Sequence, residues 1–226
     1  HGEAPHGDGG YVRTAQEGVT LGIVPDNLYT DVPLGEVTIV TAYYRIESKH
    51  SDDDYERWIA NMMSVKDPMV IFTSEDLAPR MREQRVHAAD RTKIVVRPLS
   101  ESLMGTNFTR AFWDGEFKKD PEAHKHKSVE LYWIWNEKPN WLLNAVQMNP
   151  FKSSFFAWID CGYLRDDDTR FNGKQLIRRL PANLRDNEVM FLNVNNYKLK
   201  DMDDTRLLHD NRVGGNFIGG RAEGVR

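Results

Sequence analysis

The sequence has almost no cysteine: among its 226 residues only Cys161 carries a thiol. One cysteine cannot form an internal disulfide, and it cannot build a zinc site made of several thiolates. An excess of positive charge is also missing, because the formal net charge is -4. Proteins that bind nucleic acid usually carry a concentrated basic face, so nucleic acid is not expected as a partner.

Long apolar runs are absent as well. No stretch approaches the roughly 20 apolar residues that a membrane-spanning helix needs, so we expect no transmembrane segment in this chain. The sequence also lacks a P-loop, a G-x-G-x-x-G turn, a G-x-S-x-G elbow and an H-E-x-x-H helix. The absence of a Gly-Lys phosphate loop counts against another nucleotide-using enzyme on a similar sheet.

What remains is the composition of an ordinary globular domain, with 40% hydrophobic and 28% charged residues. Residues 1–35 are rich in glycine and proline, which predicts a leader or linker before a domain at residues 36–226. The chain lacks an initiator methionine and ends abruptly on GGRAEGVR. We therefore expect the domain to be incomplete, truncated at its C-terminus, and the fragment by itself to be inactive.

Strand and helix patterns alternate along this domain. Apolar residues at helical spacing predict a helix that begins at Ser51, and a helical region at 106–149 interrupted at Pro121 and Pro139. Runs of β-branched and aromatic residues predict strands at 36–44, 68–73, 92–98, 154–160, 188–194 and 213–219. The alternation predicts an α/β fold with a Rossmann-like, mostly parallel or mixed sheet flanked by helices.

The run FFAWIDCGYLRDDD at 155–168 ends a buried strand on Asp160. In open α/β sheets, ligands lie outside the carboxyl ends of the strands, which is where this acid is expected. Carboxylate oxygen suits Mg²⁺ or Mn²⁺, and Gly162 would let the backbone approach a ligand closely. From these residues alone, Asp160 could equally cap the next turn.

Two other groups could in principle hold a metal. The first is the pair of histidines in His124-Lys125-His126, for which a solvated face is the commoner reading. The second group consists of Asp201, Asp203, Asp204 and His209.

Several segments, in this order, resemble the HtrL/YibB family, particularly its eukaryotic-type members. They are VTIVTAYYRIESKHSDDDYERW, DPMVIFTSEDL, HKSVELYWIWNEKPNWL, NPFKSSFFAWIDCGYLRD and VGGNFIGG, and together they cover about residues 36–221. The family is similar to glycosyltransferases of the GT-A fold, in which a Rossmann-like nucleotide-binding sheet joins an acceptor-binding half. The resemblance implies transfer of a sugar from a nucleoside-diphosphate sugar to a hydroxyl acceptor. The alternative is a non-catalytic sugar- or nucleotide-binding module on the same fold.

The resemblance also implies roles for residues around Asp160. This acid matches the last position of an Asp-x-Asp-like motif that holds a divalent metal, Mn²⁺ or Mg²⁺, against the donor diphosphate. Gly162 stands where many relatives of the fold have a second Asp. Arg165 could pair with phosphate or with the acids at 166–168.

Other donor-binding positions are implied in the same way. Thr41, Ala42 and Tyr43 match the strand end that lines the base and ribose, although a plain core strand is the competing reading. Asn136 and Lys138 match the helix before the metal strand, where a cation can neutralise phosphate. A solvated helix face is the commoner fate of a lysine.

The last implied feature is a strand bracketed by glycines that passes close under the sugar. The alternative interpretation is that these glycines form a sharp turn that contacts no ligand. Its glycines are Gly214, Gly215, Gly219 and Gly220. The tryptophans expected around the cleft suit either carbohydrate stacking or a core, and a core is preferred for most of them. They are Trp133, Trp135, Trp141 and Trp158. The resemblance assigns no catalytic base, and it implies the secretory pathway for a eukaryotic member and the cytoplasm for a bacterial one.

Overall fold

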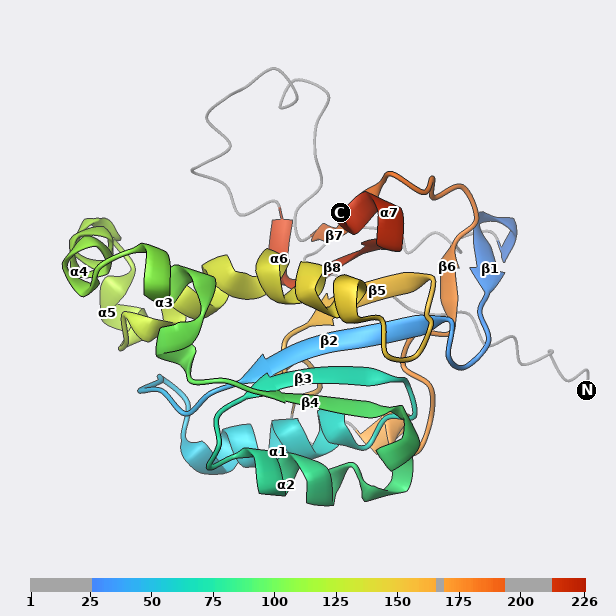
Figure 1. The fold of residues 1–226 in the computed structure, drawn as a ribbon, viewed down its shortest axis with the longest axis horizontal. Coiled ribbons are helices and arrows are strands. Elements are labelled where there is room, and N and C mark those ends of the chain that lie inside the picture. The colour runs from blue at the N-terminus through green and yellow to red at the C-terminus, as the bar shows by residue number, and fades with distance from the viewer. Residues whose placement is uncertain (1–25, 166–168, 194–212) are drawn as a thin grey trace, which may run out of the picture.

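A computed structural model describes residues 26–165, 169–193 and 213–226. Its centre is a six-stranded sheet with the strand order β4-β3-β2-β5-β8-β7 (Figure 1). The strands are β2 (Val37–Tyr43), β3 (Met69–Thr73), β4 (Thr92–Val96), β5 (Phe155–Ile159), β7 (Val189–Asn193) and β8 (Val213–Arg221). All six strands predicted from the sequence are therefore confirmed.

The sheet is mixed but mostly parallel, as predicted. β2 runs parallel to β3 and β5, and β3 runs parallel to β4. β8 is antiparallel to both β5 and β7. In the β5–β8 pair, Ile159 lies opposite Phe217 and Phe155 lies opposite Arg221, so the first half of β8 lies beside the carboxyl end of β5.

Helices cover both faces of the sheet, which explains why every residue of β2 is buried. α1 (Asp52–Met63) and α2 (Ala78–Gln84) pack on one face, and α6 (Glu130–Met148) packs on the other (Figure 1). Side chains alternate along β2, so Ile39 joins the cluster with α1 while Val40 joins the cluster with α6. The two-sided core is what the apolar strands predict.

α1 begins as the sequence predicts. The Ser51 side chain accepts a hydrogen bond from the Asp54 backbone N–H, and the Asp54 carboxylate accepts one from the Ser51 backbone N–H. This capping box satisfies two backbone donors that the helix leaves without partners. The buried face of the helix then consists of Trp58, Ile59, Met62 and Met63.

Four α-helices lie between β4 and β5 along the chain; the first three form an arm at one end of the sheet, and the fourth runs from this arm across one face of the sheet (Figure 1). They are α3 (Leu103–Asn107), α4 (Arg110–Lys119), α5 (Ala123–His126) and α6. The predicted break at Pro121 is confirmed, because it lies between α4 and α5. The predicted break at Pro139 is wrong, since α6 continues through it. Proline removes one hydrogen bond from a helix, and the packing of α6 on the sheet outweighs that loss.

The remaining elements are short. β1 (Tyr29–Asp31), within the stretch predicted as leader or linker, pairs with β6 (Arg179–Pro181) in a small antiparallel sheet. The short helices are η1 (Asp26–Leu28), η2 (Val86–Arg91), η3 (Leu99–Glu101), η4 (Thr169–Phe171) and α7 (Ala222–Val225). Among the described residues, no helix is both long and apolar enough to span a bilayer.

Candidate functional site

A cavity of about 370 Å³ opens where β2 and β5 end. Its walls come from the residues that follow these strands, from α1, and from the α5–α6 region. A volume of this size suits a small molecule, since such sites span roughly 300–1,000 Å³. The parallel strands β2 and β5 explain its position, because the carboxyl ends of parallel strands meet at one edge of the sheet.

Asp160 lies at the centre of this edge, one residue after β5 ends. Its backbone N–H donates to the Asn216 carbonyl at 3.1 Å, which ties the turn to the first half of β8. Its carboxylate oxygen Oδ1 accepts a hydrogen bond from the indole nitrogen of Trp158 at 2.7 Å. The side chain is 36% exposed, so the carboxylate is half-buried rather than enclosed.

Lys138 pairs with this carboxylate from α6. Its Nζ lies 2.8 Å from Asp160 Oδ1 and donates to the Gly215 carbonyl at 2.7 Å. The ammonium also lies 5.7 Å from the centre of the Trp158 ring, within the range of a cation–π contact. Only 7% of the Lys138 side chain is exposed. A charge this deeply buried needs partners, and these three groups supply them.

The cavity is more cationic than the chain as a whole. The described basic side chains that line it are Lys49, Lys125, Lys138 and Arg165, and the described acids are Asp52 and Asp160. Basic groups therefore outnumber acids here, although the chain has a net charge of -4. Such an excess in a concave surface favours an anionic ligand.

Aromatic rings form much of the remaining wall. Tyr55 and Trp58 pack edge to face at 5.3 Å between ring centres, and His50 packs on Trp58 at 4.8 Å. The Arg165 guanidinium lies 4.7 Å from the centre of the Trp58 ring. On the opposite wall, Trp135 is 39% exposed and contacts the ring of His126. Trp58 is only 4% exposed, so among these rings Trp135 is the one that offers an open flat surface on which a base or a sugar could stack.

Burial changes the acid–base properties of these residues. It raises the pKa of the Tyr55 hydroxyl and lowers the pKa of His50, with Arg165 and Lys49 adding to the latter shift. Burial raises the pKa of the Cys161 thiol to about 12, and the neighbouring Asp160 carboxylate adds to the rise. At neutral pH the histidine is therefore neutral and the thiol is protonated.

Three buried polar atoms at the cavity have no hydrogen-bond partner among the described residues. They are His50 Nε2, Trp58 Nε1 and Asn216 Oδ1. Buried donors and acceptors are normally satisfied, so unsatisfied ones gathered at one cavity are consistent with a polar occupant or ordered water.

The structure brings half of the predicted donor-binding residues together. Those that line the cavity are Ala42, Tyr43, Lys138, Asp160, Gly162 and Arg165. Gly162 also has a packing role, because a Cβ atom there would lie 3.3 Å from a ring carbon of Trp58.

Two predicted polar residues lie away from the described cavity lining. Thr41 is fully buried inside β2. Asn136 is exposed, and its side chain donates to the Tyr132 carbonyl one turn earlier on α6. Since residues two apart on a helix face different sides, Asn136 and Lys138 cannot both point to the sheet.

The predicted glycines divide along β8, because this strand runs antiparallel to β5. Gly214 and Gly215 lie in the half near Asp160, and the Gly215 carbonyl is the one that Lys138 contacts. Gly219 and Gly220 are buried beside the start of β5. A Cβ on Gly219 would lie 3.0 Å from Phe217, so close packing accounts for a glycine there.

The tryptophans divide in a similar way. Trp141 and Trp158 stack at 5.5 Å in the buried cluster under α6, as the core reading predicted. Trp133 is half-buried, and Trp135 is the exposed one at the cavity.

The predicted metal ligand has an unfavourable setting for a cation. Oδ1 of Asp160 already accepts from Trp158 and contacts the Lys138 ammonium. Within the described residues there is no group of three or more His, Cys, Asp or Glu side chains placed to hold a metal ion. The His124-Lys125-His126 segment is included in that statement, whereas the cluster at 201–209 lies outside the described residues. The donor set around Asp160 therefore does not amount to a metal centre.

Sequence reasoning missed several cavity residues. Trp58 lies on the apolar face of α1 and belongs to no binding motif, and His50 lies in an irregular loop that carries no motif. His126 lines the cavity from α5, with Nε2 3.5 Å from the Asp120 carboxylate. The one available signal was position, because the segment 44–50 directly follows the carboxyl end of a predicted central strand.

Comparisons with known proteins match most of this chain to one family. The family described as "Bacterial protein of unknown function (HtrL_YibB)" matches residues 35–225. Protein HtrL of Escherichia coli (strain K12) is 26% identical over 147 residues, which are 56% of this chain and 50% of that protein. The match thus spans about half the length of this curated relative, and no solved structure matches the chain significantly. The chain belongs to the HtrL/YibB family.

Proposed function

We propose that the protein is a glycosyltransferase with a GT-A-like fold that binds a nucleoside-diphosphate sugar in the cavity beside Asp160. The observation that carries the proposal is the position of this cavity. It lies at the carboxyl ends of two parallel strands, it has a cationic excess, and it has aromatic walls. A nucleotide sugar combines an anionic diphosphate with a flat base and a ring, so its parts match this lining.

In this proposal the ends of β2 and α1 contact the nucleotide. Tyr43 and Tyr55 are neighbours there, with ring centres 6.0 Å apart, and Asp52 stands at the start of α1. Lys138 and Asp160 lie toward the diphosphate. The wall formed by α5 and α6, with His126 and Trp135, faces the sugar or the acceptor.

The proposed reaction breaks the bond between the anomeric carbon and the diphosphate oxygen. The diphosphate leaves with the electron pair, and the anomeric carbon forms a new bond to the acceptor oxygen as the acceptor hydroxyl releases its proton to solvent. Cationic groups that stabilise the leaving diphosphate lower the barrier for this step. The chain supplies Lys138 for that purpose, held in place by hydrogen bonds before any ligand arrives.

A thermal-shift screen against a panel of nucleotide sugars and nucleoside diphosphates tests the proposal. We expect at least one of them to raise the melting temperature in a saturable manner, because a ligand that binds only the folded state stabilises it. The donor that binds should then lose its sugar to an acceptor, or to water, when incubated with the full-length protein. The absence of stabilisation by every compound in the panel would contradict the proposal.

The second candidate is a non-catalytic sugar- or nucleotide-binding module. One observation favours it: the carboxylate of Asp160 in the cavity is engaged by Lys138 rather than free to act on a substrate. The same screen separates the two functions. Saturable binding without transfer or hydrolysis by the full-length protein indicates the binding module, whereas turnover indicates the enzyme.

A further inference from the structure

We propose that the ammonium of Lys138, rather than a bound divalent cation, supplies the positive charge that holds a diphosphate in this cavity, and that Asp160 positions this ammonium. This inference rests on the proposed function. The sequence predicted a metal ion at Asp160. The contacts of Lys138 give the same carboxylate a different role.

The first argument concerns the hydrogen atoms of the ammonium. A lysine ammonium has three N–H donors. Its acceptors among the described residues are Asp160 Oδ1 at 2.8 Å and the Gly215 carbonyl at 2.7 Å. Lys138 also lines the cavity. Its third N–H group is therefore the one that would donate a hydrogen bond to an oxygen of the ligand.

The second argument concerns rigidity. Lysine side chains are flexible, and ordering one costs conformational entropy. Here that cost is met on folding, because the carboxylate of Asp160, the carbonyl of Gly215 and the ring of Trp158 surround Nζ. An ammonium fixed in advance stabilises a phosphate oxygen without further reorganisation.

The third argument concerns screening. Four described cations line the cavity, and Lys138 alone among them is buried. Lys125 pairs with Glu122 at the surface, and Arg165 lies exposed over the Trp58 ring. Exposed charges are screened by water and salt, whereas buried charges are screened much less. The other cations can attract an anion, but Lys138 holds it.

The fourth argument concerns the place of a metal ion. A divalent cation on Asp160 would share this carboxylate with an ammonium 2.8 Å away, so the two positive charges would repel each other. The other described acid of the cavity, Asp52, belongs to the exposed first turn of α1. Mg²⁺ and Mn²⁺ need several oxygen ligands, and this donor set offers few.

Calorimetric titration of the protein with UDP, GDP and inorganic pyrophosphate tests the inference. The nucleotides are titrated in EDTA and again in Mn²⁺, and pyrophosphate is titrated in EDTA. We expect a nucleoside diphosphate to bind in EDTA with a Kd within about threefold of its value in Mn²⁺, because in this inference the metal ion contributes little to binding. A threefold change in Kd is well below the tenfold change that corresponds to about 1.4 kcal/mol. This arm needs no variant, so it does not depend on the folding of a mutant.

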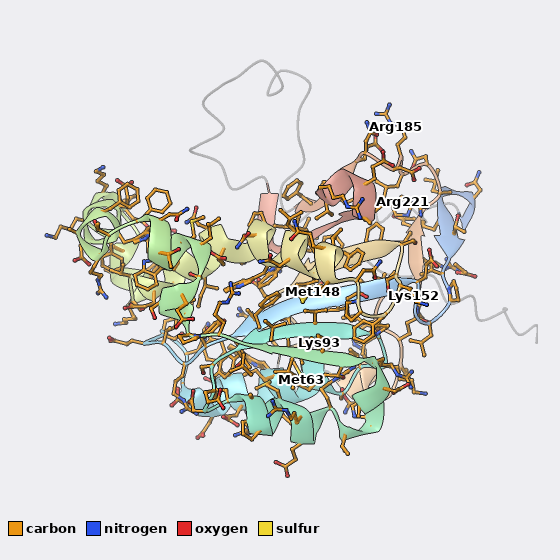
Figure 2. All side chains as sticks on the ribbon, in the orientation of Figure 1. Met63, Lys93, Met148, Lys152, Arg185 and Arg221 are labelled. Carbon is orange, nitrogen blue, oxygen red and sulfur yellow. The ribbon has the colours of Figure 1, made fainter. Side chains whose placement is uncertain are left out.

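Lys138→Met keeps the length of the side chain and removes its charge. Loss of one charged hydrogen bond should weaken binding of pyrophosphate and of the nucleotide about tenfold or more in EDTA. Lys93→Met is the matched control, because Lys93 is exposed on β4, an edge strand of the sheet (Figure 2). This control should bind as the wild type does, and circular dichroism verifies that both variants are folded.

The outcomes separate the inference from the proposed function. Nucleotide binding that needs Mn²⁺ and disappears in EDTA, or that survives Lys138→Met unchanged, overturns the inference and leaves the proposed function standing. Binding of pyrophosphate that depends on Lys138, with no nucleotide binding more tightly, upholds the charge role and contradicts the proposed function. If neither nucleotide binds in either buffer and pyrophosphate does not bind in EDTA, the inference is wrong, and the thermal-shift panel decides the proposed function.

Discussion

The Nζ atom of Lys138 lies 2.8 Å from Oδ1 of Asp160, and the lysine is the far more buried partner, with 7% of its side chain exposed against 36% for the aspartate. The pair joins α6 to the turn after β5. Because the ammonium is buried and water can reach the carboxylate, loss of the partner should cost the lysine more free energy than it costs the aspartate.

Removing the aspartate should therefore destabilise the fold more than removing the lysine. Asp160→Ala leaves a buried ammonium without its counter-charge, and we expect a loss of about 2–4 kcal/mol in the free energy of unfolding. Lys138→Met leaves a carboxylate that water can reach, and the expected loss is about 1 kcal/mol. Urea denaturation of both variants measures the two losses. Equal losses, or the reverse order, would show that Lys138 is not held as an enclosed charge.

Glu137, next to Lys138 on α6, should hold the start of α3 against α6. This carboxylate is 1% exposed and accepts the backbone N–H groups of Leu103 and Met104, at 3.2 and 2.8 Å. Glu137→Ala leaves both donors unsatisfied, so we expect a loss of about 2–4 kcal/mol in the free energy of unfolding. Glu116→Ala on α4 is the control, because Glu116 makes a surface ion pair worth at most about 1 kcal/mol.

Hydrogen exchange gives a second, local measurement of the same prediction. In Glu137→Ala the amides of Leu103 and Met104 should exchange faster than in the wild type, while amides of the central strand β2 change less. Unchanged protection at these two amides would mean that Glu137 does not hold the start of α3.

The glycines of β8 should differ in their tolerance of a side chain. A Cβ on Gly220 would lie 2.9 Å from the backbone oxygen of Glu188, so Gly220→Ala forces β7 and β8 apart and should cost about 1–3 kcal/mol. A Cβ on Gly215 has the Lys138 Nζ as its nearest neighbour at 3.9 Å, an ordinary contact. Gly215→Ala should thus change the free energy of unfolding by less than about 0.5 kcal/mol. Thermal unfolding measures the stability of the two variants. If Gly215→Ala is as unstable as Gly220→Ala, the prediction is wrong.

Cys161 should be unreactive in the folded protein. Its pKa is raised from the ordinary value of 9.0 to about 12, first by burial and then by Asp160. The thiolate is the reactive form, so at pH 8 alkylation by iodoacetamide should be at least about 100-fold slower than in the urea-unfolded chain. Mass spectrometry follows the alkylated fraction, and equal rates in both states would contradict the shift.

The same shift has a consequence for stability. The folded state holds the thiol proton more tightly than the unfolded state does, so this group contributes stability that is fully present below about pH 9. That contribution is lost as the pH rises from about 9 toward 12. The Cys161→Ser variant should lose less stability than the wild type over this interval, as urea denaturation at several pH values would show.

Local patterns in the sequence were sufficient to predict the sheet and its helices. Strand positions depend on short apolar runs, and the start of α1 depends on Ser51 and Asp54, which are three residues apart. The alternation of strands and helices also predicted that the strands are parallel. The position of Asp160 directly after an apolar run predicted an acid at the carboxyl end of β5. These features repeat at fixed spacing along the chain, so periodicity reveals them.

The contacts within the cavity were decided by the tertiary structure. The sequence did not reveal that the Lys138 ammonium lies against Asp160, and the direction of β8 placed Gly219 opposite the middle of β5 and Gly220 opposite its start, away from this acid. Pro139 was expected to interrupt a helix that packing on the sheet keeps continuous. Periodicity reports which side of an element is buried, but it does not report which distant group lies against that side. That choice depends on how the elements pack together, where a buried charge such as Lys138 must find its partner.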